Sequence, residues 1–435
     1  MKRGDRRETP EDEVAWRSVK LKYGPSRMVV WSWLILFCFT LLACPSAFGQ
    51  ANAKATPKAA EGLLFRPDDP LNAQAFDHFY NMDYDRSIQD FDQILKRHPD
   101  DPFAVNHLLV AVLFQELYRM GAMDTSEYAN DSFIATPHHP ADDNAKKRIR
   151  ELVDRAEQLE ARRLQANAND VDALYARGVT RGEFATYTAL IERAWFSALR
   201  NAVGARRDHE KVLELDPNYT EAKLIVGAHN YVMGSLSWAA KAAVAMVGLS
   251  GSKEKGIHYL RETAKSNGEA STDAKIVLVV FLRREKQYDE ALQYARNLLS
   301  AYPRNLLLAM EEGNLLRASG KNAEAEAIYR KVWQTGKGGG YPGLHYEAVA
   351  VCLGDLLRSQ NNYASAAAAY ELVNQVGKPD SEISQKANLH AGEMYDLLQK
   401  RDQALARYQT VIAVDDKTPF AETARKRIQE PYREE

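Results

Sequence analysis

Small, aromatic and aliphatic positions recur at a regular spacing along the second half of the chain. Ala291 is followed by Ala325 after 34 residues, by Ala366 after a further 41, and by Ala404 after a further 38. In the last three repeats a glycine precedes this alanine by 12 residues, and a tyrosine and a valine follow it by four and seven: Gly313, Tyr329 and Val332; Gly354, Tyr370 and Val373; Gly392, Tyr408 and Val411. A period of this length predicts a solenoid of stacked helical units.

The pattern resembles the tetratricopeptide repeat, a 34-residue helix–turn–helix with conserved types at positions 8, 20, 24, 27 and 32. The resemblance is strongest over 272–418, where the segment 287–292 and Pro303 match the second helix and the end of a repeat. A glycine-rich loop, 336–343, absorbs extra residues between two repeats. The resemblance implies an all-α, right-handed superhelical solenoid of antiparallel helix pairs, whose first helices line the concave face. Residues 419–429 form the expected closing amphipathic helix.

The preceding part of the chain shows the pattern less regularly. Segments 83–99, 156–170 and 205–218 resemble second helices, with about 15 additional residues between Gly178 and Pro217. We therefore expect diverged repeats with insertions over 70–268, a regular array over 269–430, and a tail at 431–435.

The apolar segment 231–249 departs from the repeat pattern and has two interpretations. It contains Lys241 and many small residues. One interpretation is contact with a membrane surface. The small residues favour the other, a tightly packed solenoid helix.

Composition agrees with a helical protein and limits its partners. Gly (24) and Pro (16) are scarce in 435 residues, which disfavours a turn-rich all-β fold. The formal net charge of −2 lacks the basic footprint of a nucleic-acid binder, so we predict no nucleic-acid partner.

The amino terminus has the pattern of an export signal. Residues 1–27 form a polar leader, 28–44 carry no charge, and Ala47 and Gly49 supply small residues for cleavage. We expect 28–49 to be a signal peptide, 50–69 a flexible linker, and the protein to be periplasmic or associated with the cell envelope. The apolar run is at the short limit for a spanning helix, so membrane attachment through an uncleaved 28–44 stays an alternative.

Lipidation is a further alternative at the same place. Leu41–Cys44 resembles a bacterial lipobox in which Cys44 would carry the lipid, although Leu42 and Pro45 depart from that motif. Cleavage after Gly49 would leave Cys352 as the only cysteine, which excludes an internal disulfide.

Candidate chemistry is sparse. His138 and His139, followed by Asp142 and Asp143, carry metal-ligating groups, but adjacent loop residues do not converge, and a solvated loop is expected. The glycine-rich loop lacks the ending of a phosphate-binding motif. The pair Glu311–Glu312 is interpreted as a solvated helix end. We predict no catalytic residue, no metal, no cofactor and no enzymatic activity.

The repeat register identifies a candidate partner-binding groove. Position 12 of the first helix is Arg283, Arg317 and Arg358 in successive repeats, and Asp396 in the next. Tetratricopeptide carboxylate clamps use Lys, Arg and Asn on this face, and a guanidinium pairs well with carboxylates. The alternative is intramolecular pairing of these arginines with Asp355 and Glu393. The candidate groove residues, from positions 9 and 12, are Arg283, Asn314, Arg317, Asp355, Arg358 and Glu393.

Two functions fit these features. The first is a non-enzymatic scaffold that binds a protein or peptide, of unknown identity, in its concave groove. The second is a solute-handling accessory of an envelope transport system, because the region around 231–256 faintly resembles the periplasmic T-component of TRAP transporters and, equally faintly, a mitochondrial inclusion-clearance family. A deep closed pore near 178–249 would favour the second function, and an open groove the first.

Overall fold

The computed structural model describes residues 63–123, 139–236 and 249–434, together with Trp238, Lys241 and Ala245. The leader, the apolar run with Cys44, the cleavage region at Ala47 and Gly49, and His138 lie outside the described residues. Among the described residues, no helix is both long and apolar enough to cross a membrane.

The described residues form helices, and their only β interaction is an isolated bridge between Leu64 and Gly268. The prediction of an all-α fold is therefore confirmed. The first group of helices is α3 (Asn72–Tyr80), α4 (Tyr84–Arg97), α5 (Pro102–Arg119), α6 (Asp143–Ala166), α7 (Val171–Leu190), α8 (Trp195–Leu215), η4 (Thr220–Ala222), α9 (Lys223–Ser235) and α11 (Lys253–Ala264).

The second group is the regular array. Its helices pack in consecutive pairs, α12 with α13, α14 with α15, α16 with α17, and α18 with α19, and α20 closes the end against α19. These helices are α12 (Ser271–Arg284), α13 (Tyr288–Ala301), α14 (Leu306–Ala318), α15 (Asn322–Lys337), α16 (Ala348–Ser359), α17 (Tyr363–Tyr370), η5 (Glu371–Gln375), α18 (Ser381–Leu397), α19 (Arg401–Val414) and α20 (Pro419–Gln429).

The last three regular pairs are each held by the glycine and the tyrosine of the sequence pattern. A Cβ atom on Gly354 would lie 2.3 Å from the ring of Tyr370, and one on Gly313 would lie 2.3 Å from the ring of Tyr329. Both tyrosines have no exposed surface. The glycines therefore let the two helices of a pair approach until the tyrosine ring fills the space between them, which explains the repeat in physical terms.

The segment beginning at 231 is packed rather than exposed as far as Leu236. The ring of Tyr231 stacks on Phe281 with centroids 3.8 Å apart. A Cβ atom on Gly256 would lie 2.5 Å from the backbone nitrogen of Tyr231, so α9 and α11 are in close contact. Trp238, in contrast, is 85% exposed.

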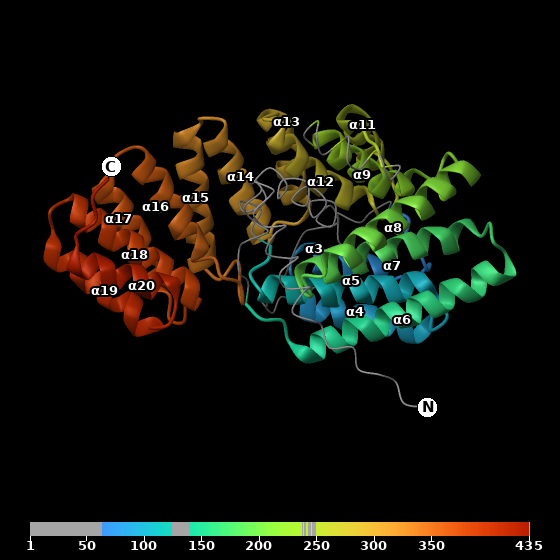
Figure 1. Ribbon diagram of the computed structural model, residues 1–435, viewed down its shortest axis with the longest axis horizontal. Coiled ribbons are helices and arrows are strands. Elements are labelled where there is room, and N and C mark those ends of the chain that lie inside the picture. Colours follow the sequence, from blue (N-terminus) through green and yellow to red (C-terminus); the bar gives the residue numbers. More distant parts are fainter. Residues whose placement is uncertain are drawn as a thin grey trace, which may run out of the picture.

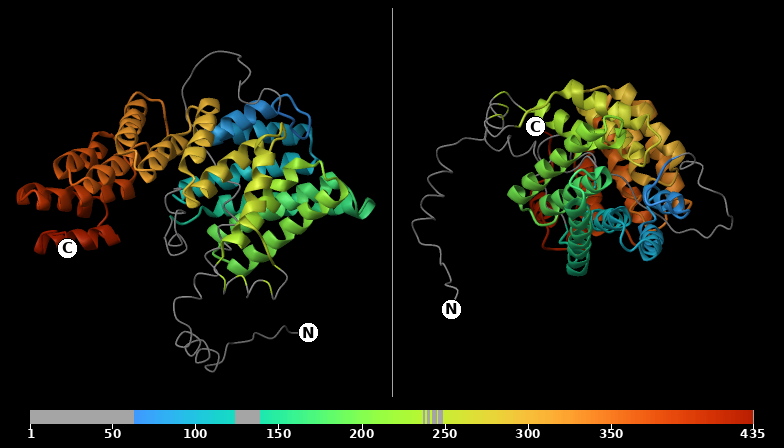
Figure 2. Two further views of the ribbon diagram at one scale, coloured as in Figure 1. Left: turned by 90° about the horizontal axis from the view of Figure 1, so that it is seen from above. Right: turned by 90° about the vertical axis from the view of Figure 1, so that its right-hand side faces the viewer.

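The amino-terminal helices return to contact the middle of the chain. Tyr80 Oη donates to Asp273 at 2.8 Å, and Asn305 Nδ2 donates to the carbonyl of Tyr80 at 3.1 Å. As Figure 1 shows, α3–α13 form a thick body at one side, from which α14–α20 extend. The views in Figure 2 show this extension from above and the curved arrangement of the helices from the end.

Candidate partner-binding groove

A shallow depression of about 400 Å³ lies between the first helices of two successive pairs, α14 and α16. We call it the arginine groove. It is lined by Arg317, Asp355, Arg358, Ser359, Asn361 and Glu434. Three of the six residues predicted from the repeat register therefore meet in one place, and a residue of the tail joins them.

Arg317 has few partners of its own. Its Nη2 donates to the carbonyl oxygen of Asp355 at 3.4 Å, a long hydrogen bond. No carboxylate of the described residues lies within ion-pair distance of it. The Asp355 carboxylate accepts a hydrogen bond from Tyr370 Oη at 2.6 Å. Burial, followed by the charge of Asp355, raises the pKa of Tyr370 well above its usual value, so this hydroxyl stays a donor.

Arg358 is surrounded by partners. Its Nη1 donates to Glu393 at 3.1 Å, its Nη2 donates to Tyr432 Oη at 2.5 Å, and its Nε lies 3.5 Å from Glu434. The alternative of intramolecular Arg–acid pairing therefore holds for Arg358 and Glu393. It does not hold for Arg317.

Arg283 and Asn314 lie outside the arginine groove. Arg283 Nη1 donates to both carboxylate oxygens of Glu311, at 3.0 and 2.8 Å. Asn314 Nδ2 donates to the same carboxylate at 3.3 Å, and Asn314 Oδ1 accepts from Tyr329 Oη at 2.8 Å. These side chains satisfy one another inside the solenoid and have a structural role.

One expectation about Glu311 was wrong. The sequence suggested a solvated helix end, but Glu311 is 2% exposed and lies under Arg283. The repeat register places Glu311 in the middle of α14, the first helix of its pair. The buried carboxylate is neutralised there by Arg283 of the preceding repeat.

Sequence reasoning missed the part played by the tail. Residues after α20 turn back, and the backbone nitrogen of Tyr432 donates to Asp396 Oδ2 at 2.8 Å. The ring of Tyr432 lies under two guanidinium groups, with Arg427 Cζ 4.7 Å and Arg358 Cζ 5.3 Å from its centroid. The available signal was an aromatic residue among acids, Glu430-Pro431-Tyr432-Arg433-Glu434, directly after the closing helix.

A second charged cluster, also not predicted, joins the entry segment to the middle of the chain. The guanidinium of Arg66 pairs with Glu221 at 2.5 Å and Asp172 at 3.3 Å. It also lies 4.6 Å from the ring centroid of Phe103. Burial raises the pKa of Glu221, and Arg66 opposes that shift. This cluster attaches residues 63–71 to η4 and α7.

Of the residues considered for a metal, the three that the structure describes, His139, Asp142 and Asp143, do not assemble a site. Asp142 accepts from the backbone nitrogens of Asn144 and Ala145, so it caps α6, and Asp143 pairs with Lys146 at 2.5 Å. His139 Nε2 lies 3.8 Å from Glu382 on the protein surface. Within the described residues no group of three His, Cys, Asp or Glu side chains is placed to hold a metal ion.

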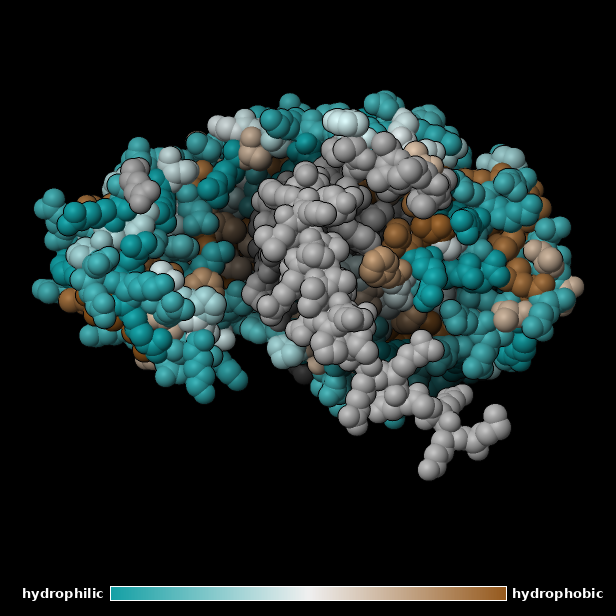
Figure 3. Space-filling view, in the orientation of Figure 1, coloured by the Kyte–Doolittle hydropathy of each residue, from teal (hydrophilic) through white to brown (hydrophobic). Residues whose placement is uncertain are grey.

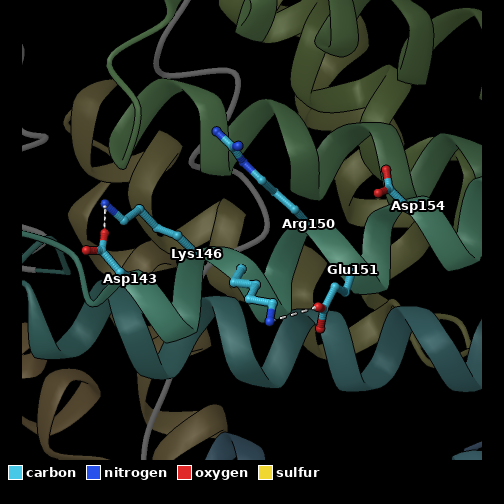
Figure 4. A pocket seen from close by; sticks show the side chains of 6 residues that line it. Asp143, Lys146, Arg150, Glu151 and Asp154 are labelled. Carbon is cyan, nitrogen blue, oxygen red and sulfur yellow. Dashed lines mark ion pairs between the residues drawn. The ribbon is translucent and has the colours of Figure 1, made fainter.

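A depression of about 380 Å³ on α6 is also lined by charged residues (Figure 4). Its side chains follow the exposed face of one helix, and Lys147 lies 3.8 Å from Glu151 one turn away. Arg150 pairs instead with Glu192 in the segment after α7. These are surface ion pairs, either between neighbouring positions of α6 or with the segment after α7, and solvent screens them.

The surface in Figure 3 separates into two regions. The end formed by α15–α20 is mostly hydrophilic, whereas hydrophobic patches gather over α7 and α8. The exposed hydrophobic residues of the described chain include Phe196 and Leu215 at the two ends of α8. On this face, the regular array therefore presents charged and hydrogen-bonding groups more than apolar area.

The helix pairs and their glycine–tyrosine contacts give this chain a solenoid fold that resembles the tetratricopeptide type. No protein-family model matches the chain, and no curated protein is similar to it. Among solved structures it is similar to PilF of Pseudomonas aeruginosa, with 18% identity, a TM-score of 0.34, and coverage of 60% of this chain and 99% of that one.

Two further solved structures match at similarly low sequence identity and TM-score. The Cut9 and Hcn1 complex of the APC/C matches at 13% identity and a TM-score of 0.42, over 84% of this chain and 56% of that one. A tetratricopeptide repeat protein of Parabacteroides merdae matches at 15% identity and a TM-score of 0.30, over 77% and 99%. With these low identities and scores, the assignment to the class depends on the helix pairs and their glycine–tyrosine contacts.

Proposed function

We propose that this protein is a non-enzymatic scaffold that binds a protein or peptide segment in the arginine groove, on the face formed by α14, α16 and α18. The proposal depends on one observation: Arg317 lines the groove and has no carboxylate partner among the described residues. An arginine in this state offers a planar pair of donors to a carboxylate of the partner.

The groove is suited to a polypeptide because it also offers oriented polar groups of both kinds. Asp355 and Asn361 supply acceptors, and Arg317 and Arg358 supply donors, along a depression that is open to solvent. Charges in such a groove determine the orientation of a bound segment and the rate of encounter. We infer that the partner segment is acidic.

Among the described residues, no observation supports the alternative of solute handling. A deep closed pore near 178–249 would favour that alternative, and the two depressions described above lie elsewhere, at α6 and between α14 and α16. The open form of the arginine groove favours the scaffold.

The first prediction tests the groove directly. Arg317→Glu reverses the charge that faces the partner, so capture of the native partner from the cell envelope by crosslinking and pull-down should fall at least fivefold. The melting temperature should change little, because Arg317 makes only one long hydrogen bond.

The matched control is Arg330→Glu on α15, whose guanidinium is 54% exposed and pairs only with Glu326 one turn away. This variant should capture the partner as the unaltered protein does. Equal capture by both variants would refute the proposed groove.

We also propose that the protein is exported to the cell envelope. Support comes from the polar leader, the uncharged run 28–44, and the small residues Ala47 and Gly49. The second prediction is that amino-terminal sequencing of the protein from the envelope fraction finds a start near Gln50. Full-length protein with residues 1–49 intact in the cytosol would contradict export.

A further inference from the structure

We propose that the arginine groove and the adjoining surface of α18 recognise a short segment in which an aromatic residue is followed, two positions later, by an acid. Residues 431–434 of the chain itself are seated there as the resident occupant, and the partner enters by displacing them. The inference rests on the proposed function of the same groove. It specifies the chemistry of the partner segment, and it identifies residues 431–434 as the segment that competes with the partner for the groove.

The aromatic position is defined by Tyr432. Its ring is covered by the guanidinium groups of Arg358 and Arg427, at 5.3 and 4.7 Å from the centroid, and its hydroxyl accepts from Arg358 at 2.5 Å. Cation–π contact on the ring and a hydrogen bond at its tip select a tyrosine over an aliphatic side chain.

The backbone position is defined by Asp396. Its carboxylate is 1% exposed and accepts from Tyr408 Oη and from the backbone nitrogen of Tyr432, both at 2.8 Å. Arg401 balances its charge at 2.8 Å. An aligned acceptor for a main-chain N–H holds a peptide in one register whatever its side chains are.

The acidic position is defined by Glu434. Its carboxylate accepts from Tyr363 Oη at 2.7 Å and lies 3.5 Å from Arg358 Nε. Glu434 is at the same time one wall of the depression, with Arg317 on α14 as another. Arg317 has no carboxylate partner among the described residues, so a partner segment with a further acid next to this arginine can pair with it.

The resident segment is held loosely enough to be displaced. Glu434 is 39% exposed and Arg358 is 25% exposed, so solvent screens their ion pair. The tail competes because it is joined to α20 and has a high local concentration at the groove. A partner that adds a carboxylate contact with Arg317 gains an ion pair that residues 431–434 do not make.

The third prediction tests this inference with a labelled, end-blocked peptide of residues 428–435, whose binding is followed by fluorescence anisotropy. The protein variant Tyr432→Ala with Glu434→Gln empties the site, so it should bind the peptide at least tenfold more tightly than the unaltered protein. Adding Arg358→Ala to this variant should abolish binding. Arg425→Ala, at an arginine of α20 whose described contacts are with Asp416, should leave it unchanged.

A second peptide with the tyrosine replaced by alanine and the acids by glutamine should not bind. Equal binding to the unaltered protein and to the tail variant, equal binding with and without Arg358, or no binding to a tail variant that melts normally would each overturn the inference. If the peptide fails but Arg317→Glu still loses the native partner, the proposed function stands alone. If the peptide binds and Arg317→Glu has no effect on capture, the scaffold proposal is the one that fails.

Discussion

At the scale of single residues, the register places three arginines at equivalent positions but does not identify the partners of their side chains. Arg283, Arg317 and Arg358 occupy equivalent positions in three repeats, yet one pairs with a buried acid, one is nearly free of partners, and one holds the tail. The difference comes from neighbours in other repeats and in the tail. A local pattern contains no information about those neighbours.

Buried acids of the amino-terminal half show the same limit. Glu160 has no exposed surface and accepts a hydrogen bond from Thr180 Oγ1 at 2.5 Å, while its Oε2 has no hydrogen-bond partner. Burial raises the pKa of Glu160 to about 7, opposed by that hydrogen bond and by Arg177 and Arg181 of α7, and assisted by Glu157. Nothing in the sequence of α6 distinguishes this glutamate from its solvated neighbours.

The fourth prediction follows from Glu160. Because its folded pKa lies above its unfolded value of about 4.5, the folded state binds the extra proton, and stability falls as pH rises from about 4.5 through 7. Glu160→Gln removes this loss, so at pH 8 it should unfold at a higher temperature than the unaltered protein, by an amount equivalent to roughly 2–3 kcal/mol. At pH 4.5 the two should nearly coincide in thermal melts followed by circular dichroism. Glu151→Gln, at an exposed position of α6, is the control, and an equal effect of Glu160→Gln at both pH values would contradict the assignment.

At the scale of elements, the chain builds helices whose ends and pairings are specified locally. Asn305 accepts from the backbone nitrogen of Leu308 at the start of α14, and Thr418 accepts from that of Ala421 at the start of α20. The predicted closing helix is confirmed, since Ala421 and Ala424 bury its inner face against the last pair. The end of α20 also determines where the tail begins, and therefore whether the tail can return to the groove.

The fifth prediction concerns α20. Thr418→Ala removes the cap and should reduce the stability of this helix by about 1 kcal/mol, seen as faster amide hydrogen exchange in 419–429. Because the tail is joined to α20, exchange at Tyr432 should rise as well. The control is Thr423→Ala, an exposed position inside the same helix whose hydroxyl bonds only to the carbonyl of Pro419. Unchanged exchange in Thr418→Ala would show that tertiary packing alone holds α20.

At the scale of the whole molecule, the amino-terminal helices close against the middle of the chain. The entry segment reaches η4 and Glu269 through Arg66, and α3 reaches α12 and α14 through Tyr80. These contacts join residues about 150 to 225 positions apart. The solenoid therefore has a thick, closed part and an extended, regular part, and the arginine groove belongs to the extended part (Figure 1).

The sequence by itself determined the helical class, the repeat register, the glycine–tyrosine contact of the last three regular pairs, and the closing helix. These features depend on spacing within one or two repeats, so a local pattern is sufficient to encode them. The tertiary structure decided which arginine has a free face, that Glu311 is buried, and that the tail occupies the groove. It also decided the closure of α3 on α12–α14. Those outcomes depend on contacts between distant segments, and the energy of such contacts has no periodic signature in the sequence.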